Sequence, residues 1–93
     1  MAAQRIEELP GGDLIAQGLA ELAQGRETVP SLLVSIGAPR LCRIGLPVSR
    51  PLPSPETRLY DRLSRQSGDA AHTRYNALIR RLVSFERAAE CAC

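Results

Sequence analysis

Arginine is the residue type best placed to do chemistry in this sequence, because four arginines cluster in its C-terminal segment. They are Arg74, Arg80, Arg81 and Arg87. They form two pairs with heptad spacing, so on a helix we expect them to make one stripe. A carboxylate three or four residues away can neutralise a helix-surface arginine, and Arg87 has such a neighbour in Glu90. The other three are expected either to stay solvated, to pair with acids on other helices, or to meet an acidic partner or a phosphate backbone.

Apolar side chains are predicted to lie beside this arginine stripe. Ile79 and Val83 would expose apolar surface on the outer side of a C-terminal helix, and Tyr75 stands near its start. An apolar strip next to unpaired arginines is typical of a helix–helix docking face. A second interpretation stays open, since Ile79 and Val83 would also fit a widened core. We take Tyr75, Ile79 and Val83, together with the four arginines, as candidate partner-binding or anion-binding residues.

Residues for catalysis or metal binding are scarce. His72 is the single histidine, and a Cys–His pair would require the fold to bring Cys42 to it. Cys91 and Cys93 offer two thiolates, whereas a structural zinc site takes four ligands. We therefore predict no catalytic residue, no metal, no cofactor and no small-molecule substrate, and we interpret the three cysteines as free thiols.

The composition suits one small domain without a strong net charge. The chain has 93 residues, with 12 arginines, no lysine and 10 acids, and its formal charge is +2. That charge is too small to argue for nucleic-acid binding by itself. Acids outnumber arginines in residues 1–30, whereas residues 31–53 carry arginines and no acid. The first part can therefore cover basic helices of the same subunit or of another. No membrane-length apolar run or export signal is found, so we expect a cytoplasmic protein with no membrane partner.

The C-terminal segment carries the clearest structural pattern. Apolar residues recur there at alternating spacings of four and three, which predicts a long helix over residues 71–92. The apolar seam consists of Ala71, Tyr75, Leu78, Leu82, Phe85, Ala89 and Ala92. We expect this helix to be central and to hold the other segments through its seam.

Two helices are predicted in the first half of the chain. The first covers residues 13–24, with Asp13 as its cap and with Gly18 where a neighbouring helix approaches closely. The second begins after Thr28, a good N-cap residue. We expect it to be kinked or split at Gly37-Ala38-Pro39, because proline interrupts the backbone hydrogen bonds of a helix.

The remaining segments are predicted to be one more helix and two irregular stretches. The helix covers residues 55–66 and follows Ser54, which is expected to cap it. Residues 47–55 are rich in proline and predict an extended connector. Residues 1–12 end in a turn signal and predict a flexible leader.

These patterns together predict an all-α protein: a single domain over residues 1–93, resembling a small four-helix bundle. We expect a non-enzymatic protein that acts through protein–protein interaction, as a homodimer or as an accessory or adaptor subunit. The alternative is a nucleic-acid-associated regulator that uses the arginine stripe. A helix-turn-helix is weakly indicated, because its second helix would be too short to lie along a major groove.

Overall fold

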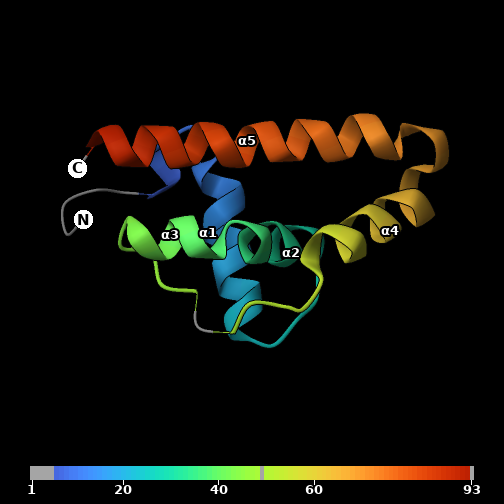
Figure 1. Ribbon diagram of the computed structural model, residues 1–93, viewed down its shortest axis with the longest axis horizontal. Coiled ribbons are helices and arrows are strands. Elements are labelled where there is room, and N and C mark those ends of the chain that lie inside the picture. Colours follow the sequence, from blue (N-terminus) through green and yellow to red (C-terminus); the bar gives the residue numbers. More distant parts are fainter. Residues whose placement is uncertain (1–5, 49, 93) are drawn as a thin grey trace.

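The computed structural model describes residues 6–48 and 50–92, and the regular structure within them is entirely helical (Figure 1). In chain order the elements are the 3₁₀-helix η1 (Ile6–Glu8), α1 (Gly12–Ala23), α2 (Val29–Ile36), α3 (Ala38–Arg43), α4 (Pro55–Ser67), the 3₁₀-helix η2 (Gly68–Ala70) and α5 (Ala71–Ala92). The prediction of an all-α protein with a long C-terminal helix is confirmed. Among the helices in these two ranges, none is both long enough and apolar enough to cross a membrane.

The most completely buried helix is α2. The sequence had instead predicted that the C-terminal helix is central. Residues Ser31–Ser35 are all buried, and α2 packs against α1, α4 and α5. α5 instead runs along one side of the molecule, and α1 crosses it steeply in the view of Figure 1. The physical reason is the width of the apolar surface, since α2 is apolar on nearly every side and α5 along one stripe.

The second predicted helix is split rather than kinked. α2 ends at Ile36, α3 begins at Ala38, and Gly37 lies between the two helices as the cap of both. The amide of Gly37 still donates to the carbonyl of Leu33, and its own carbonyl accepts from the amide of Leu41. Pro39 lies in the first turn of α3, where a missing N–H costs no helical hydrogen bond.

The close approach predicted at Gly18 is confirmed. A Cβ atom at Gly18 would lie 2.8 Å from Cγ1 of Val34 and would overlap the carbonyl oxygen of Pro30. Both of those residues belong to α2. The missing side chain therefore lets α1 and α2 pack with their backbones nearly in contact.

One of the three predicted side-chain caps is present. The hydroxyl of Thr28 accepts from the amide of Ser31 at 3.1 Å, and the hydroxyl of Ser31 accepts in return from the amide of Thr28 at 2.7 Å. Asp13 caps nothing, because α1 starts one residue earlier than predicted, after the left-handed Gly11. Ser54 also makes no side-chain cap, since its backbone is left-handed, with a φ of 47°.

The described part of the expected leader, residues 1–12, packs on the core. Residues 1–5 lie outside the described ranges. Ile6 and Leu9 are half-buried and contact the core cluster, and the amide of Leu9 donates to the carbonyl of Ile6. Apolar burial of these two side chains explains why the chain folds here.

The proline-rich connector is tied to the helices before it. Leu46 and Val48 are buried, and the amide of Val48 donates to the sulfur of Cys42 at 3.4 Å. Further along, the amide of Leu52 donates to the hydroxyl of the buried Ser35 in α2, at 3.0 Å. Cys42 thus has a structural contact that its sequence position did not reveal.

The apolar seam of α5 faces the core, and the helix is unbroken. Its fully buried members in the core are Ala71, Leu82, Phe85 and Ala89. Tyr75 and Leu78 are half-buried against the same cluster, whereas the side chain of Ala92 is outside the description. The heptad pattern therefore predicted the inward face of this helix correctly.

Candidate docking groove between α3 and α5

The structure divides the predicted arginine stripe into two parts. Two of the four arginines bind groups of their own chain. Arg81 lies 3.4 Å from the carboxylate of Asp13 in α1, so the acidic N-terminal part does cover a basic helix of its own subunit. Arg74 donates to the amide oxygen of Gln66 at 3.2 Å and to the hydroxyl of Ser67 in α4. These contacts are exposed, and exposed charge pairs contribute little to stability.

The other two arginines, Arg80 and Arg87, point away from the core. Within the described ranges neither side chain makes an ion pair or a hydrogen bond. They lie about 120° around the helix axis from Arg74 and Arg81, because each residue turns an α-helix by about 100°. The four side chains therefore do not share one face of α5.

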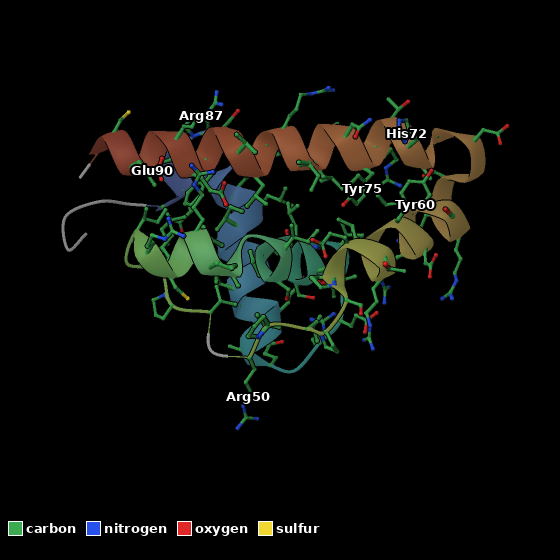
Figure 2. The ribbon with its side chains drawn as sticks, viewed as in Figure 1. Arg50, Tyr60, His72, Tyr75, Arg87 and Glu90 are labelled. Atoms are coloured by element: carbon green, nitrogen blue, oxygen red, sulfur yellow. The ribbon has the colours of Figure 1, made fainter. Side chains whose placement is uncertain are left out.

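Glu90, the predicted neighbour of Arg87, forms an ion pair with a residue of a different helix. Its carboxylate lies 3.4 Å from the Nε of Arg40 in α3. Figure 2 shows Arg87 on the outer side of α5 and Glu90 on the side that faces α3. Glu90 thus links α5 to α3, and Arg87 remains exposed.

A groove lies between α3, the joint of α2 and α3, and α5. Its volume is about 370 Å³. The joint between α2 and α3 forms one side, with Ile36, Gly37 and Pro39. On the opposite side, α5 contributes Ile79, Leu82, Val83 and Glu86, and Arg40 and Arg43 of α3 complete the lining. The groove therefore has largely apolar walls and contains one buried glutamate.

The structure brings two of the predicted partner-binding residues into this groove. Ile79 and Val83 are half-buried and line it from α5. Ile79 also packs against the core cluster, as the widened-core interpretation predicts, and the docking-face interpretation stays a prediction. Both side chains stay partly accessible in the groove.

Glu86 is the residue of the groove that the sequence analysis missed. Its exposed fraction is 4%, and its Oε1 lies 3.8 Å from the nearest nitrogen of Arg40. Within the described ranges its carboxylate accepts no hydrogen bond. Burial raises the pKa of Glu86, the charge of Arg40 opposes this rise, and the charge of Glu90 adds to it. A signal was present in the spacing, because Glu86 follows Ile79 and Val83 on the same helix face.

Gly37 lies close to the side chains of Glu86 and Leu82. A Cβ atom at residue 37 would lie 3.0 Å from Oε2 of Glu86 and 2.9 Å from Cδ1 of Leu82. A larger residue would therefore require the ends of these two side chains to shift, so the glycine lets α5 pack closely on the α2–α3 joint.

Tyr75, the third predicted apolar contact, lies elsewhere. Its ring centroid is 5.7 Å from that of Tyr60 in α4, and Tyr60 in turn meets His72 edge-on at 6.5 Å. Figure 2 shows these three side chains together where α4 meets α5. Burial raises the pKa of Tyr75, and the charge of Glu56 adds to this rise. Tyr75 stabilises the joint between these helices and is not part of the groove.

The described residues contain no cluster of three or more His, Cys, Asp or Glu side chains that could hold a metal ion. Cys42 and Cys91 are free and exposed thiols there, while Cys93 lies outside the described ranges. No family model, no curated protein and no solved structure matches this chain. The groove therefore has to be interpreted from its own chemistry.

Proposed function

We propose that this small helical, bundle-like protein is non-enzymatic and acts by binding another protein chain through the groove between α3 and α5. The bound chain would be a second copy or a subunit that this protein serves. The observation that carries the proposal is the half-buried apolar edge formed by Ile79 and Val83 beside the buried Glu86. A concave, mostly apolar surface with a few polar groups is a common form of binding site.

The shape of the groove favours a side chain or helix edge as its occupant. The groove is partly open to solvent, and its apolar wall follows one face of α5. Amphipathic helices often dock by placing apolar residues into such a surface. The exposed Arg87 and Arg80 lie on the outer side of the same helix, where they would reach the rim of an interface. Charges at a rim guide association and add specificity more than affinity.

A charge placed on the apolar wall tests this proposal. Val83→Glu should abolish association, because a carboxylate would have to be desolvated in the interface next to Glu86. Ser84→Glu is the matched control, since Ser84 is the next residue and is exposed. Size-exclusion chromatography with light scattering over a range of concentrations measures self-association, and co-purification from the native host measures a second subunit. We expect Val83→Glu to lose the assembled species and Ser84→Glu to keep it.

Two results would contradict the proposal. One is a wild-type chain that is monomeric at every concentration and carries no co-purifying subunit. The other is an assembly that survives Val83→Glu unchanged, which would place the interface on another surface. Circular dichroism of both variants should match that of the wild type, because neither replaced side chain is fully buried.

Nucleic-acid binding is the second candidate, and the outward position of Arg80 and Arg87 favours it. Two unpaired guanidinium groups one heptad apart can contact phosphates without reading sequence. Titration of non-sequence-specific duplex DNA at two salt concentrations is the test. Binding that falls steeply with salt, is lost in the double variant Arg80→Ala, Arg87→Ala and survives Arg81→Ala would support this function. Arg81 is a suitable control because it already pairs with Asp13.

A further inference from the structure

We infer that the groove between α3 and α5 accepts an apolar protein segment that carries a basic side chain, and that Glu86 binds the cationic end of that side chain. This inference rests on the proposed function and names the chemistry of the partner. An arginine or lysine beside apolar neighbours has the required form, with an apolar body and a charged end.

The first reason is that Glu86 is almost fully buried as a residue, whereas its carboxylate oxygens stay open to the groove and accept no hydrogen bond within the described ranges. Buried polar groups in folded proteins almost always have hydrogen-bond partners, and buried charges are paired. Glu86 has one charged contact, at 3.8 Å from Arg40, which is too long for a hydrogen bond. Because Glu86 lines the groove, a donor arriving there can reach it. A guanidinium or ammonium group would supply the missing hydrogen bonds.

The second point is the charge around Glu86, which sums to zero because two arginines face two carboxylates, so no net charge repels an entering cation. From α3, Arg40 and Arg43 line the groove, and from α5, Glu90 lies near. α2 contributes Ile36, which carries no charge. Arg40 is shared between Glu86 and Glu90, so it does not neutralise both carboxylates. Arg43 opposes an incoming cation, but it is exposed and its charge is screened by salt.

The third reason is the fit between the groove and a basic side chain. The groove measures about 370 Å³, which is room for a few side chains rather than for a whole helix. Ile79, Leu82 and Val83 would contact the methylene groups of the entering side chain, while its charged end reaches Glu86. An acidic or purely apolar occupant would leave this carboxylate repelled or unbound.

Small analogues of an arginine side chain test the inference on the full chain. Butylguanidinium is the cationic probe, butylurea its neutral counterpart and pentanoate the anionic one. NMR spectra of methyl-labelled protein report binding at Ile79, Leu82 and Val83. We expect butylguanidinium to shift these signals, and we expect Glu86→Gln to weaken its binding by about tenfold, the usual size of a hydrogen bond to a charged group. Asp69→Asn is the matched control, since it removes one exposed charge far from the groove.

Three outcomes would overturn the inference: equal binding of butylurea or pentanoate, unchanged binding of butylguanidinium to Glu86→Gln, or no shift of the groove signals by the cation. A groove that binds the neutral probe equally well would remove the preference for a basic partner and leave the proposed docking role in place. That role is judged separately, by the assembly of the Val83→Glu variant.

Discussion

At the scale of single residues, Glu86 lowers the stability of the isolated chain. The residue is buried in the groove, and burial raises its pKa more than the charge of Arg40 lowers it. An ionised carboxylate in that position is less favourable than the same group in water. Proteins keep such groups where function requires them, at the expense of stability. Under the proposed function, the binding role of the groove accounts for why a destabilising acid is kept at this position.

Replacing Glu86 with Gln should raise the free energy of unfolding at neutral pH and change it less in acid. Because the pKa of Glu86 is raised in the folded chain, the folded state holds the proton more tightly than the unfolded state does. The stability contributed by Glu86 is therefore fully present below the unfolded pKa and is lost as pH rises through the folded value. Urea denaturation of Glu86→Gln and wild type at several pH values measures the difference, which should widen as pH rises.

The exposed acid Asp69 provides the control for this pH dependence. Asp69→Asn replaces one exposed carboxyl by its amide outside the groove, and its difference from the wild type is the baseline for judging that of Glu86→Gln. A difference between Glu86→Gln and wild type that stays constant with pH would contradict the assignment of Glu86 as a destabilising buried acid.

Side-chain roles were predictable where the local sequence determines them. Thr28 caps α2 as expected, because an extended backbone places its hydroxyl on the amide of Ser31. Ser54 has an equally suitable side chain, but its left-handed backbone turns the hydroxyl away from the helix end. That conformation follows from how the connector reaches α4, which the residues near Ser54 do not specify. Similarly, the ion-pair partner of Glu86, Arg40 of α3, could not be found from the sequence of α5 alone.

At the scale of elements, α5 shows what periodicity can and cannot predict. The seam of α5 was predictable because its spacing alone defines one apolar face. Whether an arginine on another face of α5 binds a group of its own chain depends on where α1 and α4 lie. Asp13 of α1 forms an ion pair with Arg81, and residues at the end of α4 accept hydrogen bonds from Arg74. No element in the described ranges binds the side chain of Arg80. Tertiary position, rather than spacing, therefore separates bound arginines from available ones.

Replacing Gly18 with Ala should destabilise the protein by about 1–3 kcal/mol, the usual cost of overpacking. The added methyl group would meet the carbonyl of Pro30 and the side chain of Val34, so α1 would have to move away from α2. The sign is informative, because alanine in an unobstructed helix stabilises by about 1 kcal/mol relative to glycine. Thermal unfolding followed by circular dichroism measures the change.

Gln17→Ala is the control for Gly18→Ala. Gln17 is the neighbouring residue in α1, is exposed, and makes a hydrogen bond with the side chain of Glu21. Its replacement should change the free energy of unfolding by less than about 0.5 kcal/mol. A stabilised Gly18→Ala variant would show that α1 and α2 are not in close contact at this point.

At the scale of the whole molecule, α2 connects the other elements. Its buried apolar residues belong to one cluster that also includes side chains of α1, α4 and α5. The all-helical class was predictable from the apolar periods and the turn signals. The central place of α2 was not, because a short apolar run in sequence does not show how many neighbours will cover it. The groove was also beyond prediction, since it depends on the separation of α3 from α5, two elements that lie far apart in the chain.

Replacing Leu33 with Ala should lower the stability of the entire molecule, by about 2–5 kcal/mol, because Leu33 is fully buried at the centre of α2. Tyr60 and Tyr75 report independently from the joint of α4 and α5. If one core holds all elements, tyrosine fluorescence and helical circular dichroism should lose their signals at the same, lowered urea concentration. Leu52→Ala removes the same atoms from the half-buried connector and should cost clearly less. The contrary result is a tyrosine transition that keeps the wild-type midpoint while the helical signal shifts. It would mean that the α4–α5 hairpin is stable without α2. That stability is not expected, because α4 and α5 pack against the same apolar cluster as α2.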